Sequence, residues 1–224
     1  MDETSKTKAL WGSFELSILK GEGIDIGCGP DPVNPEVRRF DFEDGDANEI
    51  TKFVPQQFDY VYSSHCLEHM HNPWKALQEW WKLVKPGGHL FFIVPDEDLY
   101  EQGVFPSRFN PDHKATFTIS KAQSWSPVST NILDLVRSLP SSELISVSLQ
   151  DHGYNMRLIK HGAFKTRGPI LNYILKKSKG LQKHGYTFAK HIEKWIYCWR
   201  VVDQTATGAL AQIQCIVKKN ELSS

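Results

Sequence analysis

The sequence predicts an α/β fold with a mostly parallel sheet, because apolar strand-like runs alternate with a helical pattern. Residues 23–26 form a short run that ends in a glycine turn. Residues 58–63 and 89–94 are two further runs rich in aromatic and β-branched side chains. A helix is predicted between them, from Asn72 to about Val84. Strand, turn, strand, helix, turn and strand in this order are typical of a parallel sheet.

The predicted helix has start and stop signals in the sequence. Asn72 is a suitable N-cap and Pro73 a suitable first-turn residue. The segment Lys-Pro-Gly-Gly at 85–88 is expected to end the helix, and Pro95 with Asp96 is expected to end the following strand. One face of the predicted helix comprises Trp74, Leu77, Trp81 and Val84.

The glycine turn after the first strand, Gly27-Cys28-Gly29-Pro30, predicts a ligand site. Glycine allows positive φ and a close approach of backbone N–H groups, and ligands of open α/β sheets bind at the carboxyl ends of strands. A dinucleotide fingerprint would need a third glycine or alanine where Pro32 stands. Taken alone, the turn is also compatible with a purely structural role.

Composition favours one compact enzyme domain. The chain has 224 residues, of which 40% are hydrophobic and 23% charged. It shows no apolar run of membrane-spanning length and no basic-then-hydrophobic leader, so a cytoplasmic protein is expected. The cysteines lack paired spacing, which favours reduced thiols over disulfides or a zinc knuckle. They are Cys28, Cys66, Cys198 and Cys215.

The formal net charge of zero conceals an asymmetry. Residues 1–60 carry 13 Asp or Glu against 6 Lys or Arg, whereas residues 152–200 carry 11 Lys or Arg and the single acid Glu193. The basic region could meet an anionic partner such as a nucleotide sugar, a lipid phosphate or an RNA, or could be a solvated face. Residues 170–179 could touch a membrane surface.

Several motifs occur in the order of a known family. The segments DIGCGP, FDYVYSSHCLEH and LVKPGGHLFFIVP resemble class I S-adenosylmethionine-dependent methyltransferases over about residues 21–96, and residues 209–217 resemble the family's last strand. The resemblance implies one Rossmann-like domain with a mostly parallel seven-stranded sheet and helices on both faces. It divides the chain into a cofactor core (21–96), a substrate loop (97–128) and a basic elaboration before the last strand (152–205).

The resemblance implies S-adenosylmethionine as cofactor. The glycine turn would hold its amino-acid end, Asp41 the ribose, and Asp46 with Ala47 the adenine, although the roles of Asp41 and Asp46 could be reversed. The second and third strands are compressed here into one short stretch, a departure from the family pattern. The full predicted cofactor set is Asp25, Gly27, Cys28, Gly29, Asp41, Asp46, Ala47, Ser63 and His65.

The segment 65–69, His-Cys-Leu-Glu-His, matches a zinc-peptidase signature by letter, but it follows a strand instead of lying within a long helix. Ubiquinone-pathway O-methyltransferases show E-x-x-E-H here and bind magnesium. In this chain His65 replaces the first glutamate, which suits a hard cation poorly. No metal is therefore expected, and Glu68 with His69 is expected to shape the acceptor side.

Methyl transfer to a hydroxyl also needs a base, for which histidine is suited near neutral pH. The catalytic candidates are His69 and His113, and Asp96 and Asp112 are candidate substrate-binding or orienting carboxylates. The expected acceptor is a hydroxyl of a sugar or of another small or lipid-linked metabolite. The segments LEH, VPD and DHK resemble bacterial methyltransferases of polysaccharide and other glycan biosynthesis.

Two other functions stay open on the sequence. One is an RNA methyltransferase that uses the basic region and the alternating aromatic residues Trp195, Tyr197 and Trp199, although nucleic acid is the less favoured partner. The other is a scaffold that binds S-adenosylmethionine without catalysis. The sequence does not determine the oligomeric state.

Overall fold

A computed structural model describes residues 3–159, 177 and 201–221 of the chain. Most of the predicted basic elaboration, with the 170–179 stretch and the aromatic residues at 195, 197 and 199, therefore lies outside the described residues. Within the described ranges, no helix combines the length and the apolar character needed to cross a membrane.

The central sheet is mostly parallel, as the sequence predicts. Its strands β2, β1, β3 and β4 run parallel to one another, while β8 pairs antiparallel with both β4 and β7. The spatial order is β2 (Arg38–Phe40), β1 (Gly23–Ile26), β3 (Phe58–Ser64), β4 (Val84–Pro95), β8 (Gln212–Lys219) and β7 (Ser142–Gln150). The carboxyl ends of β1, β2, β3 and β4 consequently share one edge of the sheet.

The predicted count of seven strands is wrong for the described residues, where the main sheet has six. The compressed stretch after β1 makes the short strand β2, and the chain then enters a 3₁₀ segment, η1 (Ala47–Lys52), instead of another strand. Asp46 caps η1 by accepting a hydrogen bond from the Asn48 N–H, which favours a helical start over an extended strand at this point. Strands β5 (Thr116–Thr118) and β6 (Ser129–Asn131) form a separate parallel pair.

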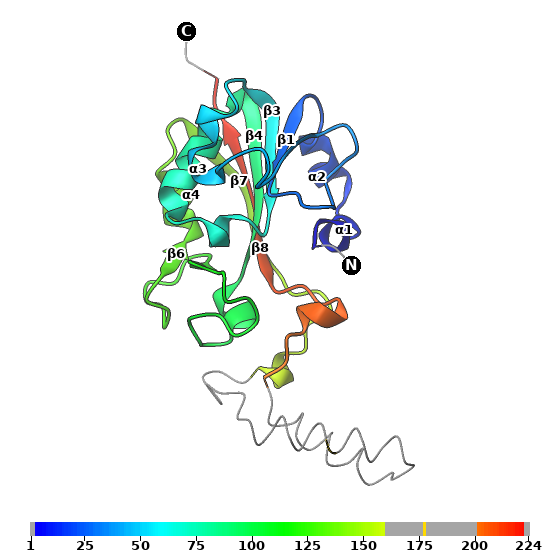
Figure 1. The fold of residues 1–224 in the computed structure, drawn as a ribbon, viewed down its shortest axis with the longest axis vertical. Coiled ribbons are helices and arrows are strands. Elements are labelled where there is room, and N and C mark those ends of the chain that lie inside the picture. Colours follow the sequence, from blue (N-terminus) through cyan, green and yellow to red (C-terminus); the bar gives the residue numbers. More distant parts are fainter. Residues whose placement is uncertain (1–2, 160–176, 178–200, 222–224) are drawn as a thin grey trace.

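Helices cover both faces of the sheet, which confirms a doubly wound arrangement (Figure 1). One face carries α1 (Glu3–Lys8) and α2 (Ser13–Ile18), and the other carries α3 (Pro73–Lys82) and α4 (Ile132–Arg137). Each face has its own apolar core. The core on the α3 side includes Leu77, Trp80 and Leu135, and the other includes Ile18, Tyr62 and Phe91.

Helix α3 begins as predicted and buries a different tryptophan. The Asn72 side chain accepts a hydrogen bond from the Lys75 N–H, and Pro73 occupies the first turn. The buried positions are Pro73, Ala76, Leu77, Trp80 and Trp81, so the inward face leaves Trp74 at its margin with 37% exposure. Leu77 and Trp81 of the predicted face are buried, Trp74 lies at its margin, and Trp80 joins the buried side chains.

The Lys-Pro-Gly-Gly segment lies inside a strand and does not form a separate turn. Helix α3 ends at Lys82, and β4 already begins at Val84. Its pairing with β3 shifts register between the Phe58 and Tyr60 positions, which accommodates the segment as an irregularity. The described chain also contains short helical turns at Leu67–His69 (η2), Glu97–Glu101 (η3), Met156–Leu158 (η4) and Thr205–Thr207 (η5).

A buried carboxylate organises the loop that follows β4. Glu97 is fully buried and accepts hydrogen bonds from one ammonium group and three hydroxyl groups. Its donors are Lys121 (2.9 Å), Ser124 (2.7 Å), Ser129 (2.6 Å) and Thr116 (3.1 Å). These contacts tie residues 116–129 to η3, so the segment predicted as a substrate loop has an internal polar core.

Candidate active site

The two glycines of the turn after β1 face different surroundings. Both have positive φ, 74° at Gly27 and 52° at Gly29. A Cβ at Gly27 would lie 2.6 Å from the Cys66 sulfur, so the space beside this glycine is filled by the protein itself. A Cβ at Gly29 would meet nothing within 4 Å. Gly29 therefore borders open space, whereas Gly27 permits close packing of the segment that follows β3.

Asp41 lies directly after β2 and meets the glycine turn. Its Oδ2 accepts a hydrogen bond from the Gly29 N–H at 2.7 Å, and its Oδ1 accepts one from the Phe42 N–H at 2.8 Å. Arg39 donates to the Gly29 carbonyl and lies 3.4 Å from the Cys28 sulfur. The structure thus brings three predicted cofactor residues, Cys28, Gly29 and Asp41, together at the carboxyl ends of β1 and β2.

Asp25 is buried in β1 and is only partly paired. Its Oδ2 accepts a hydrogen bond from the Val33 N–H at 2.7 Å, while Oδ1 has no partner among the described residues. Burial raises the pKa of Asp25 to about 7, against the hydrogen bond from Val33, which lowers it. An unused buried oxygen next to the turn fits a ligand that brings a hydrogen-bond donor.

Other predicted cofactor residues have local structural contacts. Asp46 accepts from the backbone and side-chain nitrogens of Asn48, both at 2.8 Å, and these bonds lower its pKa. The Ala47 carbonyl accepts a hydrogen bond from Trp80 Nε1. Ser63, at the end of β3, donates to the Ile26 carbonyl at 2.9 Å, so its proton links two strands.

His65 begins the segment that leads away from β3. It adopts a left-handed conformation with φ 53°, and its Nε2 lies 2.9 Å from Gln212 Oε1. Its Nδ1 lies 3.4 Å from Glu68 Oε1. Burial disfavours the charged ring, but the nearby Glu68 carboxylate outweighs burial and raises the pKa of His65.

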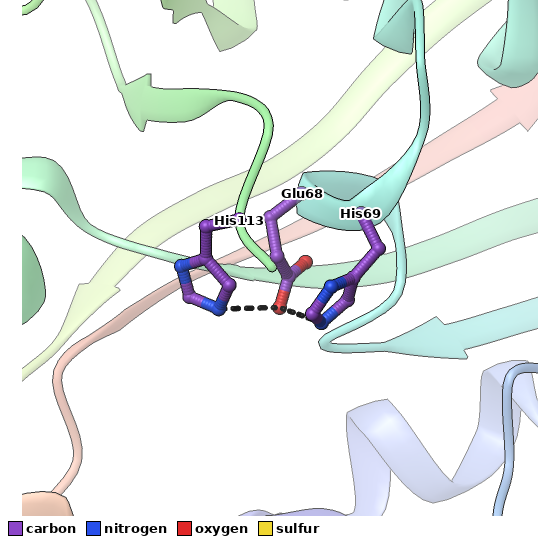
Figure 2. Close-up of side chains that lie close together, drawn as sticks. All are labelled: Glu68, His69 and His113. Atoms are coloured by element: carbon purple, nitrogen blue, oxygen red, sulfur yellow. Dashed lines mark ion pairs between the residues drawn. The ribbon is translucent and has the colours of Figure 1, made fainter. Parts of the chain in front are cut away.

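Three side chains from two segments that are far apart in the sequence converge beside η2 (Figure 2). Glu68 and His69 belong to η2, and His113 comes from the loop after η3. The Nε2 atoms of His69 and His113 each lie 4.0 Å from Glu68 Oε1. Figure 2 shows the carboxylate between the two rings, with both rings turned toward it.

Glu68 is the buried centre of this cluster. Its exposure is 0%, and neither carboxylate oxygen accepts a hydrogen bond from the described residues. Burial opposes the charged form, but the three surrounding imidazoles outweigh it and lower the pKa of Glu68. An anionic carboxylate is thus held in the interior without hydrogen-bond donors of its own.

Each histidine of the cluster has its far ring nitrogen held by a carboxylate. Asp112 Oδ2 lies 2.9 Å from His69 Nδ1, and Glu101 Oε1 lies 2.7 Å from His113 Nδ1. The Tyr100 ring stacks on His113 with the ring centroids 5.2 Å apart. These contacts fix both rings so that Nε2 stays available toward Glu68.

The two carboxylates predicted to bind or orient substrate differ in role. Asp112 is exposed, and its hydrogen bond to His69 lowers its pKa, so it orients that ring. Asp96 caps η3 by accepting from the N–H groups of Asp98 and Leu99, both at 3.0 Å. Burial raises the pKa of Asp96 to about 6. The geometry of Asp96 is that of a helix cap.

Sequence reasoning missed two residues of this region. Glu101 lies in η3 without any motif around it, so no local sequence pattern indicates its contact with His113. Arg108 is the second, because its three guanidinium nitrogens are buried and have no partner among the described residues. Burial lowers the pKa of Arg108. Its position among Pro106, Ser107 and Phe109 gave no charge pattern to notice.

Comparison with known proteins gives a consistent family assignment for the core. Residues 28–92 match the family model described as "Methyltransferase domain". This range begins in the glycine turn and ends within β4, and so contains Asp41, Glu68 and His69.

Curated relatives match over a similar extent. The chain is 32% identical over 80 residues to a ubiquinone biosynthesis O-methyltransferase of Pseudomonas fluorescens (strain Pf0-1). The aligned segment covers 31% of this chain and 32% of that protein. It is 31% identical over 91 residues to the protein of the same name from Pseudomonas savastanoi pv. phaseolicola, covering 35% and 37%. The alignments span about a third of the length of these relatives.

A solved structure similar to this chain is a SAM-dependent methyltransferase from Archaeoglobus fulgidus. The two chains are 16% identical, with a TM-score of 0.48, over 97% of this chain and 94% of the other. Residues 28–92 thus match a methyltransferase family, and the mostly parallel, doubly wound sheet around them agrees with the Rossmann-like fold that this resemblance implies.

Proposed function

We propose that this protein transfers a methyl group from S-adenosylmethionine to a hydroxyl of a sugar or of another small or lipid-linked metabolite. The observation that carries the proposal is the adjacency of two sites. The glycine turn contacts Cys66 through Gly27, and Cys66 lies two residues before the buried Glu68. A donor bound at the turn would therefore lie beside a cluster of candidate bases.

The residues at the turn fit the cofactor. The open space beside Gly29 leaves room for a ligand, and the unpaired Oδ1 of Asp25 and the half-buried carboxylate of Asp41 offer hydrogen-bond acceptors to it. The amino-acid end and ribose hydroxyls of S-adenosylmethionine need such acceptors. When bound, this cofactor supplies a methyl group already activated by its sulfonium.

The protein then has to align an acceptor oxygen and accept its proton. As the oxygen forms its bond to the methyl carbon, the sulfur–carbon bond breaks with its electron pair on sulfur, and the hydroxyl proton goes to a ring nitrogen. His113 and His69 are the proposed bases, because carboxylates hold their Nδ1 atoms and leave Nε2 for this proton. Glu101 and Asp112 act as positioning residues.

An oxygen acceptor is supported by the names of the curated relatives, which are O-methyltransferases. Those relatives match only the core of the chain, so their substrate is not carried over. The segments after β4, which would meet the acceptor, lie mostly beyond residues 28–92. A glycan or a smaller hydroxyl metabolite remains our proposal for the acceptor class.

Arg108 supports an acceptor that carries an anionic group. A buried guanidinium without a partner is costly, and a carboxylate or phosphate would offset that cost by a bidentate hydrogen bond. Arg108 adjoins Phe109, whose ring lies 5.7 Å from Tyr100, the residue stacked on His113. The anion would thus be held by the loop that carries a proposed base.

Isothermal titration of the full chain with S-adenosylmethionine and with its demethylated product tests the donor assignment. We expect both to bind, and we expect Asp41→Asn to weaken binding at least tenfold while the fold is retained. A folded protein that binds neither compound would contradict the proposed function.

Methyl transfer from labelled cofactor to neutral sugars, nucleotide sugars and RNA tests the acceptor. We expect His113→Gln to lower kcat by 10²–10⁴-fold, the usual contribution of general-base catalysis. Arg108→Gln should raise KM for anionic acceptors and leave neutral ones unchanged. Transfer to RNA alone would refute the small-molecule assignment, and full turnover in both His69→Gln and His113→Gln would refute the base assignment.

A further inference from the structure

We propose that Glu68, His69 and His113 form a binding site for a divalent transition-metal ion of intermediate softness, for which Zn²⁺ is the probe. Their ligand atoms all lie within 4.8 Å of one another. Two imidazoles and one carboxylate are a donor set that binds zinc or ferrous iron in proteins while leaving further positions open. Figure 2 shows the three side chains directed at a common point from η2 and from the loop after η3.

The state of Glu68 is the first independent support. Both of its oxygens are buried and accept no hydrogen bond from the described residues. A buried carboxylate in this state is costly unless something pairs with its charge. The imidazole nitrogens of His65, His69 and His113 surround Glu68 at 3.4–4.0 Å but donate no hydrogen bond to it, so a divalent cation would give its oxygens the direct partner that they lack. The ligand atoms lie within 4.8 Å of one another and would close to about 3.4 Å, the separation in a tetrahedral zinc site.

The outer hydrogen bonds are the second support. A histidine that binds metal through one nitrogen usually donates its other N–H to a carboxylate or carbonyl, which fixes the tautomer and strengthens the ligand. Both rings have this arrangement, His69 with Asp112 at 2.9 Å and His113 with Glu101 at 2.7 Å. Two such pairs that converge on one buried carboxylate favour a metal site over an incidental contact.

The donor set also predicts which ions bind. Nitrogen ligands from two histidines favour zinc-like ions over Mg²⁺, which prefers oxygen ligands and retains its water. His65 Nδ1, 3.4 Å from Glu68 Oε1, offers a further nitrogen on the same side. The proposal departs from the sequence expectation of no metal, because that expectation considered residues 65–69 and did not include His113.

A cation here would take over part of the proposed chemistry. An Nε2 atom that binds metal has no lone pair for a proton, so the base role of His69 and His113 applies to the metal-free protein. In the metal-bound protein the ion would hold the acceptor oxygen and lower the pKa of its hydroxyl. This last role rests on the proposed function, whereas metal binding itself does not.

The test is equilibrium dialysis of the untagged full chain, treated with a chelator and then exposed to Zn²⁺, with the bound metal measured by mass spectrometry. We expect one ion per chain, not displaced by millimolar Mg²⁺. Co²⁺ should give visible absorption bands typical of nitrogen ligation. The variants Glu68→Gln, His69→Gln and His113→Gln should each weaken binding at least tenfold.

Matched controls separate the site from general histidine binding. His71→Gln, an exposed residue near η2, and His89→Gln in β4 should bind Zn²⁺ as the unmodified chain does. Asp112→Ala changes an exposed side chain and should weaken binding by about 10–100-fold, so it tests the site even where a cluster variant fails to fold. A folded chain that binds no Zn²⁺ would overturn the proposal, and so would Zn²⁺ binding in both Asp112→Ala and His113→Gln equal to that of the unmodified chain.

The outcome of the Zn²⁺-binding experiment does not depend on whether the chain transfers a methyl group. Cofactor titration can fail while Zn²⁺ binds at this cluster, in which case the site stands and the methyl-transfer assignment falls. Conversely, S-adenosylmethionine can bind a chain that takes up no metal, which would overturn the metal site and leave the base assignment in place.

Discussion

Two glycines in one turn carry different constraints. The sequence treats Gly27 and Gly29 alike, since both permit a left-handed backbone near a ligand. In the structure the Cys66 side chain fills the space beside Gly27, and only Gly29 borders open space. Close packing against Cys66 thus explains the glycine at position 27, and access to open space explains the glycine at position 29.

Substitution of each glycine should separate these roles. Gly27→Ala should lower the free energy of unfolding by about 3 kcal/mol, because it adds overpacking against Cys66 to the strain of positive φ. Gly29→Ala meets open space and should cost only about 1 kcal/mol, while weakening S-adenosylmethionine binding. Urea denaturation and cofactor titration measure both effects. Equal stability losses in the two variants would contradict the packing difference.

The buried carboxyl of Asp25 should make stability depend on pH. Its pKa of about 7 lies above the ordinary value of 3.8, mainly because of burial, with Asp31 and Asp41 adding to the rise and Arg39 opposing it. The native state therefore holds this proton more tightly than the unfolded state does. Stability should fall as pH rises from about 4 to about 7, by up to roughly 4 kcal/mol from this group.

Asp25→Asn should remove that part of the pH dependence. The amide keeps an oxygen for the Val33 N–H but does not ionise. Urea denaturation at pH 5 and pH 8 should show a smaller stability loss in Asp25→Asn than in the unmodified chain. Glu43→Gln, at an exposed position, is the control and should leave the difference unchanged. The same pH dependence in Asp25→Asn and the unmodified chain would contradict the assignment.

At the scale of elements, helix α3 shows what periodicity can and cannot give. Its start was predicted from Asn72 and Pro73, because capping is a local interaction of neighbouring residues. Its inward face was predicted less well. Trp74 lies three residues before the buried Leu77 and Trp80 lies three residues after it, so helical spacing alone allows either tryptophan on that face. The sheet decides between them by burying Trp80 at 0% and leaving Trp74 at the margin.

These two tryptophans make a matched pair for testing the packing of α3. Trp80→Phe should lower the free energy of unfolding by about 2 kcal/mol, because it removes the hydrogen bond to the partly buried Ala47 carbonyl and part of the core volume. Trp74→Phe should change it by less than about 0.5 kcal/mol. Denaturant unfolding of the two variants measures the difference, and a larger loss at Trp74 would show that the helix is rotated from its position here.

The η2 segment and the loop after η3 illustrate the opposite case. The segment His-Cys-Leu-Glu-His places Glu68 and His69 beside each other in the sequence. His113 lies in a different segment and was predicted only as a separate candidate base. The fold brings His113 to 4.0 Å from Glu68 and gives it Glu101 as a partner. Contacts between residues far apart in sequence depend on how β4 and its following loop pack, which no local pattern encodes.

For the whole molecule, binding of the donor should be visible as thermal stabilisation. A ligand at about 100 times its Kd adds roughly 2.7 kcal/mol to the stability of the native state. For a chain of this size that is a rise in Tm of about 5–10 °C. S-adenosylhomocysteine should produce this rise, and Asp41→Asn should reduce it. No shift in the folded, unmodified chain at saturating ligand would contradict the site at the glycine turn.

Features that depend on neighbouring residues were predicted better than features that depend on distant ones. The parallel sheet and the order of its strands along the chain followed from local runs, caps and turns, and the glycine turn lies at the end of β1 as predicted. Among the described residues the main sheet has six strands instead of seven, because the stretch after β2 forms η1 under the Asp46 cap. Cys28, Gly29 and Asp41 were predicted together and do meet, whereas Asp46 and Asp96 serve as caps, a use that an acidic residue before a turn allows equally well.

The sequence by itself determined the α/β class, the similarity of the core to methyltransferases and the position of the glycine turn at the edge of the sheet. These depend on periodicity, glycine conformation and capping, all of which act between near neighbours. Only the tertiary structure decided that Gly27 accommodates Cys66 and that Trp80 fills the core. It also decided that Glu68 lies between His69 and His113 with no hydrogen-bond donor among the described residues. The reason is physical: burial and charge pairing are set by segments that meet only after the chain has folded.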